Sequence, residues 1–350
     1  MTQDPLLALT HWAETGQRGA LAIVVKAYGS SPRPLGAMMA VAESGDFVGS
    51  VSGGCVESAV VQEALDTLAE GRPRLKTYGI SDEWAWEAGL TCGGKIQVFI
   101  LPWQPNQVWR ELLSAREHKE PVVLGVGYEG RWTAEVGLFY RDGRTVGELA
   151  RHALALADML TAAFREERAR SGAVLPDGRT SVLIIPFFPP QRLIIIGAVH
   201  IAIALVRFAN ELGYETIVID PRPVFATSER FGHADQLLVS WPQEAIPRLH
   251  PDPGASIAVI SHDDKLDIPA LKLALESDVR YIGALGSRKT MARRMQLLRE
   301  EGFSDDALAR IHNPIGLDLG GRTPEEIALA IMAEVVATRY GREFRGKALG

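Results

Sequence analysis

The two cysteines of this 350-residue chain each lie beside a pair of glycines. One motif reads Ser-Gly-Gly-Cys over residues 52–55, and the other reads Cys-Gly-Gly over residues 92–94. Paired glycines let the backbone approach a ligand and leave main-chain N–H groups pointing outward. A thiol near a helix start favours the thiolate, which attacks electrophiles and binds soft metals. The alternative is a small buried apolar side chain in each turn. The candidate residues are Gly53, Gly54, Cys55, Glu57, Cys92, Gly93 and Gly94.

The elements around the first motif are predicted from hydrophobic patterning. Residues 20–27 read as a buried strand, and the proline- and glycine-containing loop 28–36 follows it. Residues 38–42 and 47–51 read as two further strands. Apolar residues then recur at every fourth position from Val56 to Leu68, and Gly71 ends this helical stripe. The pattern places Cys55 in the first turn of the helix, where the helix dipole favours an anion.

The second motif is expected to connect two strands. A short strand is predicted at residues 75–78, and the Cys-Gly-Gly turn leads into another at residues 95–101. Pro102 and Pro105 mark a domain boundary, so the first domain is assigned to residues 1–105. A middle α/β region and linker over residues 106–188 contain strands at 122–128 and 132–140 and a helix reaching about residue 170. No internal repeat is apparent.

The third region, residues 189–350, has the pattern of a Rossmann-like domain. A buried strand at 192–196 leads into Gly197 and a helix, and a second strand at 216–219 ends at Asp220. This is the layout of a dinucleotide-binding unit. Further strands are predicted at 236–239, 257–261 and 279–282. Val199 stands where the fingerprint has its middle glycine, and a β-branched side chain there crowds the path of a pyrophosphate. The predicted fold class is α/β, with an N-terminal α/β domain and a C-terminal doubly wound parallel sheet.

Polar residues follow the carboxyl ends of these predicted strands, where ligands bind in such sheets. The segment 286–288 combines a glycine, a hydroxyl and a guanidinium at a helix start, which suits an oxyanion. Ordinary structural explanations also exist. Residues 262–264 can form a solvated turn with a helix cap, Arg222 can pair with Asp220, and His200 can be a helix residue. The candidate ligand residues at this edge are Gly197, His200, Asp220, Arg222, His262, Asp263, Gly286, Ser287 and Arg288.

Composition excludes several classes of function. The net charge of −6 argues against a nucleic-acid partner. The longest apolar stretch, residues 193–206, is too short to span a bilayer, and no secretory signal is visible at the start of the sequence. Two cysteines without an export signal indicate a cytoplasmic protein with free thiols. No spacing typical of a zinc site is present.

Taken together, these motifs resemble the xanthine dehydrogenase accessory factors of the XdhC/CoxI type, over nearly the whole chain. The N-terminal part of the resemblance is carried by Gly29–Pro34 with Gly36–Met38, by Ser52–Glu57 and by Cys92–Gly94. The C-terminal part is carried by Arg192–Ala202 with Val218–Arg222, and by the segments Tyr281–Arg288, Pro314–Asp318 and Thr323–Ala328. The chain departs from the family pattern at Val199.

The resemblance implies a maturation factor for molybdenum hydroxylases. Such proteins bind the molybdenum cofactor, as molybdopterin or its cytosine dinucleotide, protect it, and assist its sulfuration and insertion. The implied partners are the large subunit of an apo molybdenum hydroxylase and a cysteine desulfurase. The resemblance gives Cys55 and Cys92 cofactor-contacting roles. Because backbone N–H groups suit the cofactor phosphate and a thiolate suits its soft metal centre, we hypothesise that Cys55 contacts the molybdenum or its exchangeable sulfur, with Glu57 and Cys92 shaping the pocket.

Two alternatives are kept. One is an NAD(P)-dependent oxidoreductase that uses the Rossmann-like domain, against which Val199 and the absence of an identifiable proton donor count. The other is a scaffold that only bridges the desulfurase and the apo-enzyme. The sequence does not decide whether the protein is itself a catalyst. A homodimer is the expected assembly because closed two-fold dimers are the commonest oligomers.

Overall fold

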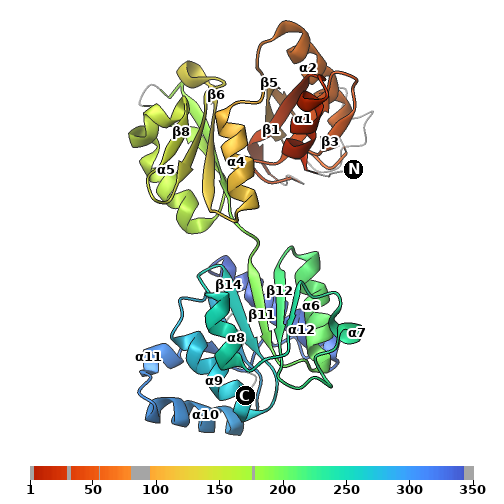
Figure 1. Cartoon of the computed structure of the whole chain (residues 1–350). Coiled ribbons are helices and arrows are strands. Elements are labelled where there is room, and N and C mark those ends of the chain that lie inside the picture. The colour runs from red at the N-terminus through yellow and green to blue at the C-terminus, as the bar shows by residue number, and fades with distance from the viewer. Residues whose placement is uncertain (1–3, 30–32, 55, 80–94, 176–177, 343–350) are drawn as a thin grey trace. The chain divides into compact units, whose positions relative to one another are not determined.

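The computed structural model describes residues 4–29, 33–54, 56–79, 95–175 and 178–342. The chain divides into two compact units, Met1–Pro189 and Pro190–Gly350. Both contain helices and strands (Figure 1). The two units are described separately.

The first sheet of the N-terminal unit is antiparallel, with strand order β3-β2-β1-β5-β4. Helix α1 (Pro5–Glu14) covers one face and α2 (Glu57–Glu70) the other. The alternation of side chains along β1 explains both layers: residues 21, 23 and 25 pack with α1, and residues 20, 22 and 24 pack with α2. The strands are β1 (Gly19–Tyr28), β2 (Met38–Ala42), β3 (Phe47–Gly49), β4 (Arg74–Tyr78) and β5 (Lys95–Trp103).

The second sheet of this unit is also antiparallel, with strand order β8-β7-β6-β10-β9. Helix α4 (Gln107–Glu117) shares its core with the first sheet, and α5 (Ala153–Glu166) covers the other face. Short 3-10 turns lie at Gly130–Trp132 and Leu149–His152. The strands are β6 (Val122–Glu129), β7 (Val136–Tyr140), β8 (Thr145–Gly147), β9 (Arg170–Ala173) and β10 (Ser181–Phe187).

The two sheets repeat one topology, in which a helix, three strands, a helix and two strands follow each other in the same order. The turns also match: Gly45 and Gly143 have φ of 89° and 90°, and Gly49 and Gly147 have φ of 90° and 98°. A Cβ on Gly49 would overlap the carbonyl oxygen of Met38, and one on Gly147 would overlap that of Val136. The expectation that the chain has no internal repeat was therefore wrong.

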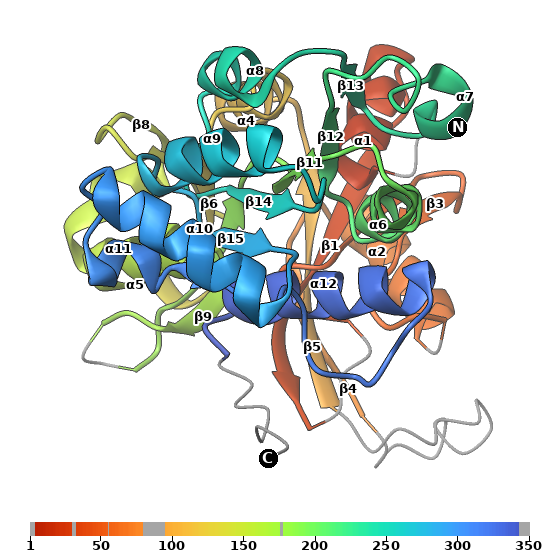
Figure 2. The same ribbon diagram turned by 90° about the horizontal axis from the view of Figure 1, so that it is seen from below.

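The C-terminal unit confirms the predicted doubly wound sheet. Its strand order is β13-β12-β11-β14-β15-β16, and the neighbouring strands are parallel. Figure 2 shows α6 and α12 on one face and α8 and α9 on the other. The strands are β11 (Arg192–Ile196), β12 (Glu215–Ile219), β13 (Gln236–Leu238), β14 (Ala255–Val259), β15 (Tyr281–Ala284) and β16 (Ile311–His312). The helices are α6 (His200–Glu211), α7 (Ser228–Phe231), α8 (Pro242–Leu249), α9 (Asp264–Leu275), α10 (Arg288–Glu300), α11 (Asp305–Leu308) and α12 (Pro324–Arg339).

Several expected boundaries change. Helix α2 begins at Glu57, two positions after Cys55, so the predicted first turn starts too early. The strand expected at 132–140 is a 3-10 turn followed by β7. Helices α1 and α4 and strand β10 were not predicted at all. In the part of the chain described here, no helix is long and apolar enough to cross a membrane.

Candidate functional site

The Ser-Gly-Gly loop between β3 and α2 is organised by one carboxylate. Glu57, the first residue of α2, is 7% exposed, and its two oxygens accept six hydrogen bonds from the loop. The Ser50 and Ser52 hydroxyls donate at 2.6 and 2.5 Å. The remaining donors are the backbone N–H groups of Ser52, Gly53, Gly54 and Val56, at 2.9, 3.1, 2.9 and 3.2 Å.

This environment fixes the charge of Glu57. Burial alone raises the pKa of a carboxyl, but the hydrogen bonds from Ser50 and Ser52 outweigh it and lower the pKa of Glu57 to about 2. All six donors are neutral groups, so the carboxylate is stabilised by oriented dipoles. Glu57 is therefore ionised at neutral pH and holds the loop in one conformation.

The sequence suggested that the amides of Gly53 and Gly54 point outward toward a ligand. In the structure they donate to Glu57 instead, and Gly53 also donates to the Ser50 hydroxyl at 2.8 Å. The loop amides up to Gly54 thus bind the carboxylate of Glu57, an anion of the protein itself. Cys55 itself, together with Cys92, Gly93 and Gly94, lies outside the described residues.

The predicted residues of the C-terminal unit do gather at one sheet edge. They follow the carboxyl ends of β11, β12, β14 and β15, which run parallel in register. Gly197 has φ of 109° and packs so closely on Ser261 that a Cβ would lie 2.6 Å from the Ser261 Cα atom. The turn after β11 therefore requires glycine, as the fingerprint predicted, and it closes tightly on the loop after β14.

The carboxylate of Asp220, at the end of β12, already has hydrogen-bond partners within the protein. Asp220 is fully buried and accepts hydrogen bonds from the Ala198 amide at 2.8 Å and from the Arg222 guanidinium at 2.9 and 2.7 Å. Burial raises the pKa of Asp220, but these bonds, led by Arg222, lower it overall. The alternative that Arg222 simply pairs with Asp220 is therefore confirmed. A ribose hydroxyl would have to displace Arg222 to reach this carboxylate.

The other residues at this edge serve mainly as helix starts. Asp263 caps α9 by accepting from the Lys265 amide at 3.0 Å, and Ser287 caps α10 by accepting from the Thr290 amide at 3.1 Å. His262 is exposed with φ of 61°, and His200 and Arg288 are exposed first residues of α6 and α10. Gly286 is half-buried in the turn before Ser287.

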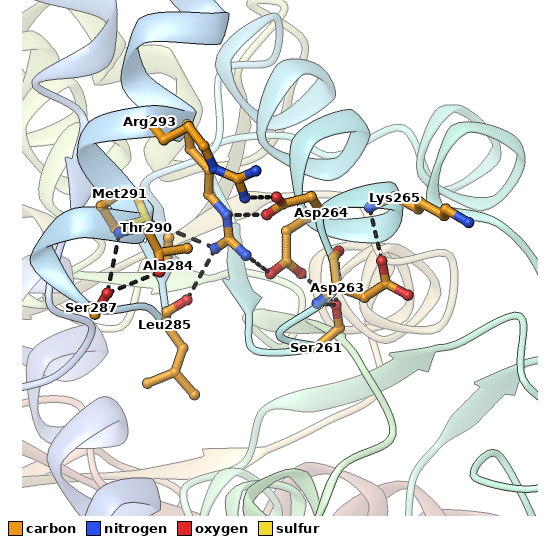
Figure 3. Close-up of polar contacts among 12 residues, drawn as sticks. Ser261, Asp263, Asp264, Lys265, Ala284, Leu285, Ser287, Thr290, Met291 and Arg293 are labelled. Atoms are coloured by element: carbon orange, nitrogen blue, oxygen red, sulfur yellow. Dashed lines mark hydrogen bonds and ion pairs between the residues drawn. The ribbon is translucent and has the colours of Figure 1, made fainter.

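Sequence reasoning missed the buried ion pair beside these caps (Figure 3). Arg294 is 2% exposed and donates to Asp267 at 2.6 Å, to Asp264 at 2.8 Å and to the Leu285 carbonyl at 3.1 Å. Asp267 is fully buried and also accepts from the Ser261 hydroxyl at 2.5 Å. Burial raises the pKa of Asp267 despite these partners. A position on a basic helix suits an anionic ligand, but here Arg294 ties α10 to α9.

Within the described ranges, no group of three or more His, Cys, Asp or Glu side chains is placed to bind a metal ion.

Comparison with known proteins identifies the family of the chain. The XdhC Rossmann domain model matches residues 193–335, and the XdhC and CoxI family model matches residues 12–79. The chain belongs to the XdhC and CoxI family. Both matched regions carry a cluster described above, the Glu57 loop in residues 12–79 and the parallel-strand edge in residues 193–335.

Relatives of this XdhC and CoxI family chain match along its length. The molybdenum cofactor insertion chaperone PaoD of Escherichia coli strain K12 is 29% identical over 329 residues, covering 94% of this chain and 86% of that protein. A probable xanthine dehydrogenase subunit of Bacillus subtilis strain 168 is 28% identical over 332 residues, covering 93% and 94%. A solved structure described as a xanthine dehydrogenase from Bacillus halodurans superposes with a TM-score of 0.74 at 27% identity, covering 100% of this chain and 98% of that one.

Proposed function

We propose that this protein binds the molybdenum cofactor and inserts it into an apo molybdenum hydroxylase. Family membership supports the proposal, as does the name of the insertion chaperone that matches 94% of this chain. The observation that carries it is the Glu57 network, because six hydrogen bonds hold the segment that leads directly to Cys55.

Such a loop suits a soft metal centre. A thiolate is a preferred ligand for soft or borderline metals, and a rigid loop holds it without the entropy cost of ordering on binding. Cys55 contacts the molybdenum or its exchangeable sulfur in this proposal, and Cys92 to Gly94 complete the pocket. Glu57 acts as a positioning residue, since its carboxylate is occupied by the loop itself.

The finer parts of the proposal concern the protein's partners. The protein protects the cofactor in the cytoplasm, assists its sulfuration with a cysteine desulfurase, and delivers it to the large subunit of a xanthine dehydrogenase-like enzyme. It does so as a homodimer. Delivery implies reversible binding, which a pre-formed loop permits because no folding step separates the free and loaded states.

Cofactor loading tests the function directly. The full chain is purified without oxygen, mixed with molybdenum cofactor and freed of excess ligand, and bound pterin is quantified by fluorescence after oxidation. We expect near-stoichiometric pterin on the wild type and a loss of at least tenfold in Cys55→Ser, because a hydroxyl does not replace a thiolate on a soft metal. Cys92→Ser is run beside it.

The alternative of an NAD(P)-dependent oxidoreductase is tested in the same samples. The Rossmann strand order favours it, whereas Val199 and the occupied Asp220 oppose it. Wild-type protein that binds NADPH and no pterin would replace the proposed function with the oxidoreductase. Equal amounts of bound pterin on the wild type and both cysteine variants would leave the proposed chaperone function standing and would show that the cysteines are not part of its binding site.

A further inference from the structure

A large cavity opens inside the N-terminal unit beside the Ser-Gly-Gly loop. Its volume is about 920 Å³, within the range of small-molecule sites. Its wall is built from both repeats: the start of α1, the loop before β2 and strand β3 from the first, and α4 and β10 from the second. Its apolar lining includes Met38, Phe47, Val48, Ile185 and Phe187.

Two guanidinium groups line this cavity. Arg33 is exposed on the loop before β2, and Arg116 lies in the last turn of α4, over the Phe187 ring at 5.8 Å from its centroid. Arg116 is held by Asp4, whose carboxylate also accepts from the first amides of α1. The charged side chains in the lining are therefore two arginines and one aspartate, which leaves the wall net positive. Arginine binds phosphate with two parallel hydrogen bonds.

The cavity is continuous with the Glu57 network. Ser50 lines the cavity and donates its hydroxyl to Glu57, and the same carboxylate holds the amides of Gly53 and Gly54. Ser50 lies five positions before Cys55 in the chain, and a chain of five residues spans at most about 17 Å. Ser50 therefore connects the cavity to the loop that leads to Cys55.

The parallel-strand edge of the C-terminal unit offers less to a phosphate. Arg222 is paired with the buried Asp220, and Arg294 is buried against Asp264 and Asp267. Displacing either arginine would leave a buried carboxylate without its partner, which is strongly unfavourable. Arg33 is exposed and lines the cavity, so its guanidinium is accessible to a ligand there.

We propose that the cavity of the N-terminal unit binds the phosphate-bearing end of the pterin cofactor, with the Arg33 guanidinium as its ionic contact. This rests on the proposed function, and it moves the anion site from the Rossmann-like domain to the first unit. The apolar wall around Phe47, which is 51% exposed, packs against the organic part of the ligand.

The test measures binding of purified molybdenum cofactor, intact or treated with phosphatase to remove its terminal phosphate, to the full-length chain. We expect Arg33→Gln to weaken binding of the intact cofactor by about tenfold, as for loss of a charge-assisted hydrogen bond. Phosphatase treatment should weaken wild-type binding by a similar factor and should change the affinity of Arg33→Gln by less than about twofold, because the two changes remove one interaction.

Two further variants complete the test. Arg110→Gln removes an exposed arginine of α4 that does not line the cavity, and it should bind as the wild type does. Val48→Trp leaves every charge in place and fills the cavity, so it should weaken binding of both cofactor forms. Circular dichroism of each variant checks its fold.

The outcomes separate the two proposals. Wild-type binding that neither Arg33→Gln nor Val48→Trp weakens would overturn the cavity assignment and leave the chaperone function standing. A wild type that binds no cofactor would overturn both. Equal losses in Arg33→Gln and Arg110→Gln would show only a general effect of charge and would also overturn the assignment.

Discussion

The two repeats of the N-terminal unit share a scaffold and differ in their connections. Between β3 and α2 the first repeat has the glycine-containing segment 50–56, whereas between β8 and α5 the second has residues 148–152, mostly a 3-10 turn. The connection of β4 to β5 spans residues 79–94, and that of β9 to β10 spans only 174–180. Both Gly–Cys motifs fall in the connections where the repeats differ.

This comparison separates scaffold from chemistry. The sheets, the covering helices and the matching glycine turns are common to both repeats, so they follow from the need to build a stable layered fold. The Ser-Gly-Gly loop belongs to the first repeat alone. A rigid scaffold that carries distinct loops is the usual way for a fold to acquire a site, and the second repeat shows what the fold needs without one.

The largest expected effect tests the shared scaffold. Gly49→Ala and Gly147→Ala should each destabilise the protein by about 4 kcal/mol, because the new Cβ combines an unfavourable φ with overlap on the neighbouring strand. Urea unfolding of the full chain, with hydrogen exchange to locate the change, measures both. Values for the two variants that differ by more than about 2 kcal/mol would break the proposed equivalence.

The matched controls are Gly45→Ala and Gly143→Ala. These glycines have nearly the same φ as the first pair, but a Cβ on either meets nothing within 4 Å. Only the cost of the left-handed backbone remains, about 1–2 kcal/mol. The difference between the pairs therefore isolates the steric contribution in each repeat.

The next effect tests where the repeats differ. Glu57→Gln should destabilise the first repeat by about 3 kcal/mol, since the amide has no charge and its NH₂ group faces hydrogen-bond donors. Hydrogen exchange at residues 50–54 should rise by at least tenfold. Glu148→Gln changes an exposed carboxylate in the connection between β8 and α5 of the second repeat, and it should change stability by less than about 0.5 kcal/mol. A silent Glu57→Gln would show that the loop does not depend on this carboxylate.

The smallest effect is the pH dependence of the same carboxylate. The pKa of Glu57 is about 2 in the folded chain, below its usual 4.5, so its contribution is complete above about pH 5 and is lost as pH falls toward 2. Between pH 5 and 3.5 the wild type should lose about 1 kcal/mol more than Glu57→Gln does. Urea midpoints of the two proteins across this range measure the difference, and parallel curves would contradict the assigned pKa.

Local patterns predicted most strands and the C-terminal sheet. Runs such as Arg192–Ile196 identify buried parallel strands, and Thr323 with Glu326 forms the capping box expected at the start of α12. Helices α1 and α4 were missed because their apolar faces are short and their signals weak beside the neighbouring strands. The start of α2 was misplaced because Val56 fits the helical stripe yet occupies the N-cap position.

The candidate site was predicted in part. The sequence nominated Glu57 as a residue that shapes a pocket, but it could not show that the carboxylate occupies the loop amides. Arg33 lies in the segment 29–34 that carries part of the family resemblance, yet no local pattern assigned it a role. Arg33 and Arg116 are 83 positions apart, and only the packing of one repeat on the other places both on one cavity.

The sequence by itself determined the α/β class, the parallel sheet and the two Gly–Cys motifs, because periodicity and glycine placement are local properties of the chain. The tertiary structure alone decided which charges are buried in ion pairs. Arg294 meets Asp267, which lies 27 positions before it in the chain, while Arg33 is exposed at a cavity wall. Whether a charged side chain is buried against a partner depends on residues brought together by folding, and their separation along the chain does not encode it.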